Sequence, residues 1–211
     1  MMGPQQIFLL SPANCSGPRG QLLLSERSQF ALAQSLRSAN GVSLGEVFSF
    51  ISGLYFRGKL TYATAFGRPP CGLTGSLIIT AARGLLPPDT TVRVADLREL
   101  AAVPIDPADP RYAEPLSRDA RKIRERLDVA ARVILLGSIA TDKYSSILGD
   151  ILGEQLLFPV AFVGRGDMSR GGLMLRCVDE GNELEYIPLS NATRRGQRPA
   201  RLAPRRKPSQ D

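Results

Sequence analysis

Four short apolar segments, separated by segments with helical periodicity, place the strongest constraint on the fold of this chain. They lie at residues 6–11, 76–80, 133–136 and 156–163, and their centres are apolar throughout rather than alternating. Strands buried on both faces have this pattern, and helices between them indicate parallel crossovers. We therefore expect an α/β fold, a three-layer sandwich with a mostly parallel central sheet, helices on both faces and a C-terminal hairpin.

The segments between these strands carry local helix signals. Apolar spacing predicts a helix from residue 21 or 25 to residue 39, and Ser43 with Glu46 forms a capping-box pattern that opens the next helix. Further helices are expected at 55–66, at 117–131 with a charged solvated face, and from 141 or 142 to 152. Residues 173–178 and 183–187 are expected to form the terminal hairpin.

The positive charge is concentrated at the C-terminus. The chain has 27 basic and 20 acidic residues and a net charge of +7. Seven of the basic residues and one of the acidic ones lie in residues 191–211. We expect one domain at 1–190 and a disordered basic tail at 191–211, which acts either as a solubilising segment or as a phosphate-contacting arm.

Composition excludes several kinds of chemistry. The chain has no histidine, which removes the most frequent general base and metal ligand, and its three cysteines are far apart in sequence. We expect no zinc site, and no metal or organic cofactor. The apolar segments are too short to span a bilayer and no cleavable signal is evident, so the expected location is the cytoplasm, without a membrane partner.

Two polar, glycine-rich segments follow predicted strands, at residues 11–20 and 164–172. Ligands of open α/β sheets bind where loops leave the carboxyl ends of strands, so both segments are expected to contribute to one site. The first lacks the glycine patterns of dinucleotide-binding and phosphate-binding loops. Its Asn14 can hold a water or contact a base edge, or it merely caps a turn, while Gly17 and Gly20 allow close backbone approach.

The later segment combines basic, acidic and apolar side chains. Arg165 and Arg170 flank Asp167 and Met168. Arginine suits phosphate contacts and an exposed methionine can insert between bases, although an Arg–Asp pair bracing a turn is the simpler reading. Between the two segments, residues 136–144 form a strand, a glycine turn and a helix start, which is either an anion site at Ser138 or a purely structural junction.

These motifs resemble the uracil-DNA glycosylase superfamily. Asn14 followed by Gly17-Pro18-Arg19-Gly20 is similar to the asparagine and Gly-Pro-x-Gly turn of its single-strand-selective members, with wider spacing. Residues 135–140, Leu-Leu-Gly-Ser-Ile-Ala, are similar to its late strand motif, and residues 165–172 occupy the place of its intercalation loop. Residues 54–57 and 83–89 also resemble an uncharacterised bacterial domain family. That resemblance supports the architecture but implies no particular activity.

The chain departs from the superfamily in two places. In the superfamily a histidine usually opens the intercalation loop, whereas this chain has Val163-Gly164 near that place. The asparagine that reads uracil in many members is also missing after residues 78–80, where Ala81-Ala82-Arg83 follows. Two alternatives remain open: the substrate base is unlike uracil, or catalysis has been lost.

The resemblance implies a DNA glycosylase that flips out an unusual or modified base and hydrolyses its N-glycosidic bond. Asn14 would position the water, Asp167 or Asp89 would supply the carboxylate, and Met168 would be the wedge. The other candidate substrate or DNA contacts are Ser11, Ser16, Gly17, Arg19, Arg57, Arg83, Ser138, Arg165, Ser169 and Arg170. The alternatives are a non-catalytic nucleic-acid-binding module and a nucleoside or nucleotide N-glycosidase, for which Lys143 and Tyr144 come into consideration. The oligomeric state stays open.

Overall fold

The computed structural model describes residues 4–202. Its helices are α1 (Pro18–Leu24), α2 (Ala31–Arg37), α3 (Leu44–Ser52), α4 (Leu54–Phe66), α5 (Val94–Ala102), α6 (Pro110–Arg126), α7 (Ser145–Leu152) and α8 (Asp167–Glu180). Its strands are β1 (Gln6–Leu10), β2 (Val42–Ser43), β3 (Ser76–Ile79), β4 (Leu85–Leu86), β5 (Thr91–Val92), β6 (Arg132–Leu136), β7 (Leu156–Pro159) and β8 (Tyr186–Pro188).

The central sheet has six strands in the order β4-β3-β1-β6-β7-β8. Strand β1 pairs in parallel with both β3 and β6, and β6 pairs in parallel with β7. The edge strands β4 and β8 are antiparallel to their neighbours. All five residues of β1 are buried, as expected for a strand covered on both faces. The mostly parallel sheet of the predicted fold class is therefore confirmed.

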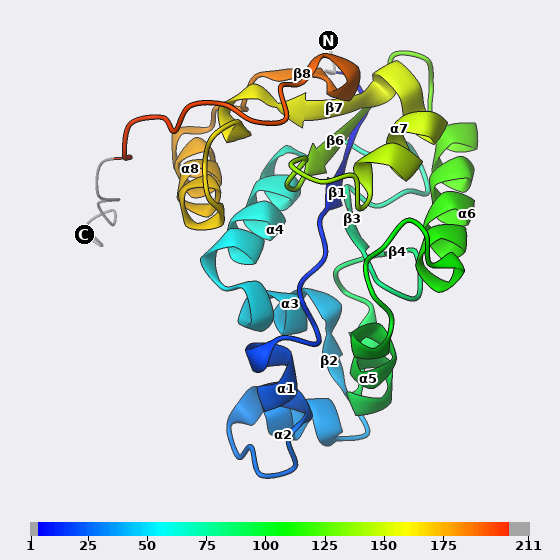
Figure 1. The fold of residues 1–211 in the computed structure, drawn as a ribbon, viewed down its shortest axis with the longest axis vertical. Coiled ribbons are helices and arrows are strands. Elements are labelled where there is room, and N and C mark those ends of the chain that lie inside the picture. The colour runs from blue at the N-terminus through cyan, green and yellow to red at the C-terminus, as the bar shows by residue number, and fades with distance from the viewer. Residues whose placement is uncertain (1–3, 203–211) are drawn as a thin grey trace.

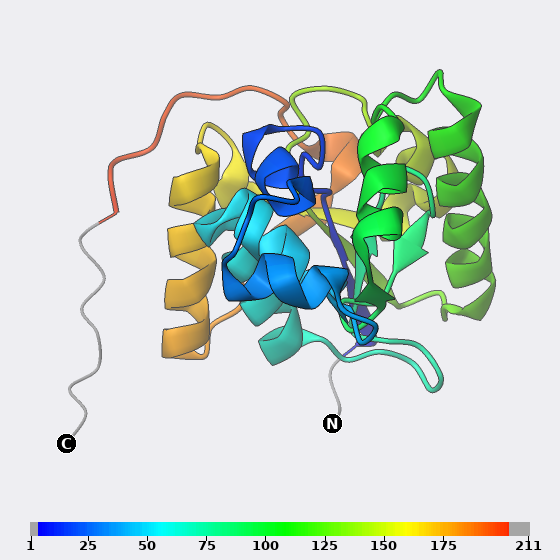
Figure 2. The same ribbon diagram turned by 90° about the horizontal axis from the view of Figure 1, so that it is seen from below.

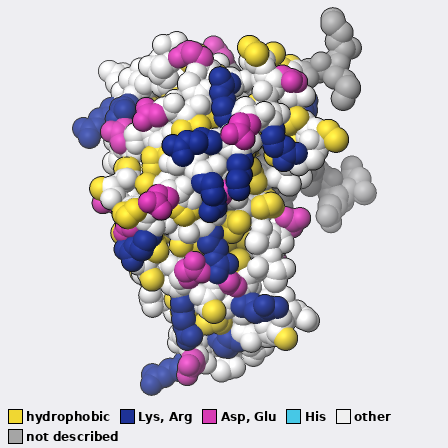
Figure 3. All heavy atoms as spheres, turned by 90° about the vertical axis from the view of Figure 1, so that its right-hand side faces the viewer, with side chains coloured by type: hydrophobic (Ala, Val, Ile, Leu, Met, Phe, Trp, Pro, Cys, Tyr) yellow, Lys and Arg dark blue, Asp and Glu magenta, His cyan; other side chains and the backbone are white. Residues whose placement is uncertain are grey.

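Helices cover both faces of this sheet and complete three layers. Helices α4 and α8 lie on one side, and α6 and α7 lie on the other (Figure 1). Seen from below, α8 and α6 mark the two outer flanks of the molecule (Figure 2). Helix α6 buries Tyr112, Leu116, Ala120 and Ile123, so its charged side chains face outward. The face on this side mixes basic and acidic groups (Figure 3), which agrees with the solvated face expected there.

A smaller layer of short elements sits beyond the carboxyl end of β1. It contains α1, α2, α3, α5 and the two-stranded sheet β2-β5 (Figure 1). The predicted N-cap is confirmed, because the Ser43 hydroxyl accepts from the Glu46 amide at 3.2 Å. The Glu46 carboxylate accepts from the Ser43 hydroxyl at 2.9 Å rather than from its backbone amide, so only half of the capping box forms. Between α3 and α4 the chain turns at Gly53, whose φ of 59° suits glycine. The single helix expected up to residue 39 is instead two short helices.

The structure corrects the expected secondary structure near the C-terminus. Residues 173–178 are not a strand of a hairpin but lie within α8, and the antiparallel partner of β8 is β7. Residues 167–172, expected in a loop, form the first turns of the same helix. Its buried residues are Arg170, Gly171, Met174 and Cys177, and this spacing follows a helical rather than a two-residue period.

The segment after β8 lies against the body of the protein. Its described part, residues 192–202, passes beside α8 (Figure 2). Arg194 pairs with Asp142 at 2.6 Å, and a Cβ on Gly164 would lie 2.0 Å from the carbonyl oxygen of Gln197. Part of the tail proposed at 191–211 thus has defined contacts, while its residues 203–211 lie outside the described residues.

Candidate functional site

A cavity of about 530 Å³ lies at the carboxyl ends of the parallel strands. Strand β1 has parallel neighbours on both sides, reached by crossovers in opposite directions, and this is the point at which α/β sheets bind ligands. The cavity is lined by residues 11–16 after β1, Ala81 after β3, Ser138, Thr141, Lys143 and Tyr144 after β6, Asp167 of α8, Ser52 and Tyr55 near the α3–α4 turn, and Leu100, Val103, Pro104 and Ile105 at the end of α5.

The loop after β1 presents Asn14 to this cavity. Its side chain is exposed, and its carbonyl oxygen accepts a hydrogen bond from the Ser16 hydroxyl at 2.9 Å. The expected close approaches at the glycines occur here. A Cβ on Gly17 would lie 2.9 Å from the amide nitrogen of Asn14, and one on Gly20 would lie 1.8 Å from the carbonyl oxygen of Cys15. Glycine at these two positions therefore lets the loop fold back over the first turn of α1.

The end of β6 forms a second wall. The Tyr144 hydroxyl accepts from the amide of Ser138 at 2.8 Å and donates to its carbonyl at 2.6 Å. A Cβ on Gly137 would meet this hydroxyl at 2.7 Å, so glycine is required for the contact. Burial raises the pKa of Tyr144 and keeps it a neutral hydroxyl. The turn predicted around Ser138 is thus closed by Tyr144.

The first turn of α8 brings Asp167 to the cavity. Its side chain is 67% exposed and lies 3.8 Å from the guanidinium of Arg170. Arg170 is buried and donates from Nε and Nη2 to the carbonyl of Phe162, at 3.2 and 3.0 Å. The Arg–Asp pairing expected from the sequence is present. Because the Arg170 guanidinium is directed inward, Arg170 fixes the start of α8 and is not positioned as a surface phosphate contact.

Two buried residues of α4 extend the site inward. Tyr55 is only 6% exposed, and its hydroxyl has no hydrogen-bond partner among the described residues. Burial raises its pKa, so the hydroxyl is a neutral donor. Lys59 is 1% exposed, and its ammonium nitrogen lies 2.8 Å from the carbonyl oxygen and 2.9 Å from the hydroxyl oxygen of Ser11.

Several of the expected site residues lie elsewhere. Arg83 pairs with Glu99 and, at 2.7 Å, with Asp96, so it braces α5 rather than contacting a base. Asp89 and Arg57 line a separate shallow hollow beside α3 and α4. The Nη1 group of Arg19 donates to the carbonyl of Phe50 at 3.1 Å. Of the two candidate carboxylates, only Asp167 therefore shares a cavity with Asn14.

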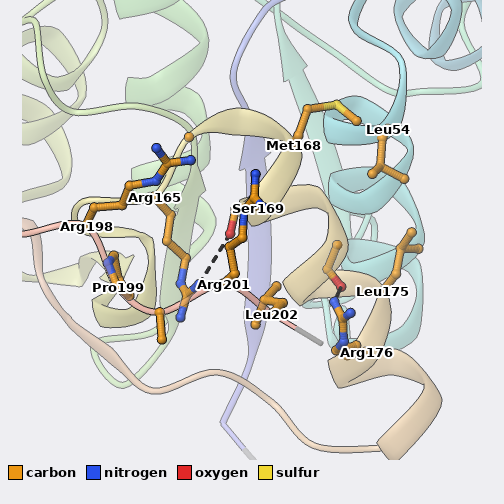
Figure 4. Close-up of a pocket in the computed structure, with 13 residues that line it drawn as sticks. Leu54, Arg165, Met168, Ser169, Leu175, Arg176, Arg198, Pro199, Arg201 and Leu202 are labelled. Atoms are coloured by element: carbon orange, nitrogen blue, oxygen red, sulfur yellow. Dashed lines mark hydrogen bonds between the residues drawn. The ribbon is translucent and has the colours of Figure 1, made fainter. Parts of the chain in front are cut away.

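A second hollow, of about 480 Å³, lies on the outer side of α8 and is bordered by arginines (Figure 4). Arg165, Arg176, Arg198 and Arg201 line it, and no Asp or Glu is among its described lining residues. Arg165 also donates to the Ser169 hydroxyl at 3.3 Å. Met168, 65% exposed, lies at the rim between the helix start and Leu54. This surface, the arginine hollow, joins α8 to the described part of the tail.

Other reactive groups contribute little to the site. Burial raises the pKa of the Cys15 thiol to about 12, so this cavity-lining cysteine is a neutral thiol at physiological pH. Over residues 4–202 no cluster of three or more potential metal-ligating His, Cys, Asp or Glu side chains occurs. No helix in the same range is long and apolar enough to cross a bilayer.

Sequence reasoning missed Tyr55 and Lys59 as site residues. The buried residues of α4 are Tyr55, Phe56, Gly58, Lys59, Tyr62 and Ala63, a stripe with helical spacing in which Lys59 is the only charged member. Lysine is rarely buried without a specific partner. A cation within an apolar stripe was therefore a usable signal in the sequence.

Comparison with known proteins adds no relative: no family model, no curated protein and no solved structure matches this chain. Any function must be inferred from the cavity, the arginine hollow and the motifs themselves.

Proposed function

We propose that this chain hydrolyses the N-glycosidic bond of an unusual or modified base in DNA, with the flipped base held in the cavity at the carboxyl ends of β1, β3 and β6. The observation that carries this proposal is that Asn14 and Asp167, more than 150 residues apart, line one cavity of about 530 Å³. A volume of this order lies within the range of small-molecule sites. The motif resemblance to the uracil-DNA glycosylase superfamily points to the same activity.

The roles of the cavity residues follow from their chemistry. The exposed Asn14 amide is suited to hold the attacking water. The Asp167 carboxylate belongs to the later motif and lines the same cavity, where it offers negative charge to an oxocarbenium-like sugar. The neutral Tyr55 hydroxyl, which has no partner among the described residues, can donate to the departing base. None of these roles requires a histidine.

The arginine hollow supports a polymeric substrate. It begins one residue from Asp167, because Gly166 and Met168 line the hollow while Asp167 lines the cavity. Arginine guanidinium groups bind phosphates through directed hydrogen bonds. A strand with its phosphates in the hollow would bring a neighbouring nucleotide to the cavity, with Met168 between the two.

The test is incubation with oligonucleotides and phage DNA that carry varied bases, followed by alkali to reveal abasic sites. Asn14→Ala should lower the excision rate by about 10²-fold, as for loss of one preorganised polar group. Asn40→Ala is the matched control, because Asn40 is an exposed loop asparagine that does not line the cavity, and it should leave the rate unchanged.

Other outcomes would contradict the proposal in identifiable ways. Binding without strand scission across a wide base panel would favour the non-catalytic module. Release of a free base from nucleotides, but not from polymer, would favour a nucleoside or nucleotide N-glycosidase. Equal rates for Asn14→Ala and the wild type would remove Asn14 from the mechanism.

A further inference from the structure

The least expected group near the cavity is the amine of Lys59, which lies in the interior beneath Ser11. Its residue is 1% exposed, and its nitrogen donates to the Ser11 carbonyl oxygen at 2.8 Å and to the Ser11 hydroxyl oxygen at 2.9 Å. Ser11 in turn lines the cavity. The hydroxyl of Ser11 therefore lies between the buried amine and the space proposed for the substrate.

Ser11 is held firmly at this place. Its backbone amide donates to the carbonyl of Leu136 at 3.0 Å, which extends the β1–β6 pairing by one residue. A Cβ on Gly137 would lie 2.8 Å from the Cβ of Ser11, so the neighbouring strand approaches as closely as glycine permits. This packing fixes the hydroxyl with respect to both the amine and the cavity, as a group used in proton transfer requires.

The surroundings of the Lys59 amine are apolar on the side of its own helix. The rings of Tyr55 and Phe56 lie 4.4 and 4.7 Å from the nitrogen. From α8, Asp167 and Arg170 act on it with opposite signs. Asp167 forms its ion pair with Arg170. Among residues 4–202 no carboxylate lies within ion-pair distance of Lys59. An ammonium ion here has the two Ser11 oxygens and the two ring faces as partners but no neutralising carboxylate, so its burial is costly.

We propose that Lys59 and Ser11 form a proton-transfer pair, in which Ser11 contacts the attacking water and Lys59 is the positioning residue that receives the proton through it. This inference rests on the N-glycosylase activity proposed above. It is a serine–lysine arrangement, in which a buried amine serves where many enzymes use histidine. The absence of histidine from the sequence leaves such an amine as the base available at this position.

The protonation state of the amine agrees with this role. The pKa of Lys59 is lowered from 10.5 to about 7. Burial is the main cause, the charge of Asp167 opposes it, and the charge of Arg170 adds a smaller lowering. A large fraction of the amine is then neutral near pH 7, whereas an exposed lysine is almost fully charged there. Because only the neutral amine can accept a proton, activity should increase as the pH rises toward 7 and level off above it.

The proton and electron balance of the step is simple. As the water oxygen forms a bond to C1′ of the sugar, a water proton passes to the Ser11 hydroxyl oxygen and the Ser11 proton passes to the Lys59 nitrogen. The C1′–N bond breaks with its electron pair leaving on the base, which takes a proton from solvent. Lys59 then returns its proton to solvent through Ser11, so that one water has been added across the bond.

The first test measures the amine itself and does not depend on catalysis. In protein labelled with ¹³C and ¹⁵N lysine, the Cε and Nζ signals of the four lysines are followed from pH 5 to 11 and Lys59 is assigned with Lys59→Arg. We expect Lys59 to titrate near pH 7, well below the usual range of an exposed lysine. In Ser11→Ala the midpoint of Lys59 should fall, because the ammonium loses an acceptor. A midpoint near 10, or one unaffected by Ser11→Ala, would overturn the proposal.

The second test uses the excision rate. The wild-type rate should rise about tenfold per pH unit below pH 7, and Ser11→Ala should lose this dependence together with about 10²-fold or more of the rate. Lys59→Arg keeps the charge and the donors but cannot lose its proton, so it should be equally impaired. Lys122→Arg on the exposed face of α6 is the matched control and should behave as the wild type.

The two tests separate failure of the pair from failure of the proposed function. If no substrate is excised but Lys59 titrates near 7 and responds to Ser11→Ala, the pair stands and the glycosylase assignment fails. If excision occurs with the same pH profile in Ser11→Ala and the wild type, the glycosylase stands and the pair is wrong. If Lys59→Arg does not fold, the effect of Ser11→Ala on the Lys59 titration and on the excision rate tests the pair by itself. The Lys59 signal is then assigned as the lysine signal that is absent in Lys59→Met.

Discussion

At the scale of single residues, the sequence allowed some site residues to be predicted and hid others. Asn14 and Asp167 were identified because each follows a predicted strand, and both line the cavity. Arg83 was wrongly expected to contact the substrate or DNA, and the inward direction of Arg170 was not foreseen, because their partners, Glu99 and the Phe162 carbonyl, come near only in the folded chain. Lys59 was not recognised as a site residue because its neighbours form an apolar helical stripe, which is typical of a core-facing helix.

Gly20 offers a residue-scale prediction about the loop that carries Asn14. In Gly20→Ala the new Cβ would start 1.8 Å from the carbonyl oxygen of Cys15, a backbone atom that cannot rotate away. We expect a loss of about 2 kcal/mol or more in the free energy of unfolding, as for severe overpacking. Urea denaturation measures it.

The control for this substitution is Gly149→Ala in α7, where a Cβ would meet nothing within 4 Å. This variant should gain about 0.5–1 kcal/mol, because alanine favours helix over glycine. Similar stabilities for the two variants would mean that the contact between α1 and the 14–16 loop is looser than the geometry indicates.

At the scale of elements, helices and strands that depend on local sequence signals were predicted correctly, whereas those that depend on tertiary contacts were not. The buried strands and the N-cap at Ser43 are confirmed, because each depends on residues close in sequence. Helix α8 was missed because Gly171 and Gly172 in its first turns are weak helix formers. Glycine at position 171 has a tertiary reason, because α4 and α8 approach so closely there that a Cβ on Gly58 would lie 2.7 Å from the Gly171 carbonyl oxygen.

This glycine contact between α4 and α8 yields an element-scale prediction. In Gly171→Ala the Cβ would lie 2.7 Å from the carbonyl oxygen of Leu54, so α8 must move away from α4. Because Asp167 lies one turn earlier on α8, we expect a loss of about 1–3 kcal/mol in stability together with a reduced excision rate. Thermal unfolding and the abasic-site assay measure the two effects.

Gly172→Ala is the adjacent control on the same helix. Its Cβ would meet the flexible end of the Arg176 side chain at 3.3 Å and the Cδ1 atom of Leu202 at 3.9 Å, which is an ordinary van der Waals distance. The free energy of unfolding should therefore stay within about 1 kcal/mol of the wild type or rise slightly. If Gly172→Ala were the more damaging change, close packing of α4 on α8 would not be what positions Asp167.

At the scale of the whole molecule, the fold class followed from the sequence because buried parallel strands leave a continuous apolar pattern. The uneven distribution of charge was also visible, with residues 1–190 nearly balanced. What could not be foreseen is that part of the basic tail lies beside α8 and contributes Arg198 and Arg201 to the arginine hollow. That arrangement depends on contacts such as Arg194 with Asp142, which join distant segments.

The arginine hollow leads to a prediction about salt dependence. If its guanidinium groups contact phosphates, the double variant Arg198→Gln/Arg201→Gln should reduce the slope of log affinity against log salt by about 1–2 for an oligonucleotide. Fluorescence anisotropy at several salt concentrations measures this slope. The pair Arg118→Gln/Lys122→Gln on α6, whose side chains lie beside the single carboxylate of Asp119 and do not line the hollow, should leave the slope close to that of the wild type. An equal reduction by both pairs would indicate diffuse attraction rather than a defined contact surface.

The central position of β1 bears on how this chain acquires its structure during synthesis. Phe8, made first, pairs with Ser76 on one side and with Ile134 on the other. Contacts of such large sequence separation slow folding, because the intervening loop must close before they form. A nascent chain therefore carries the buried strand β1 with one edge unpaired until β6, more than 100 residues later, has been synthesised. During that interval chaperones have a binding site, and premature termination leaves a fragment that is prone to aggregate.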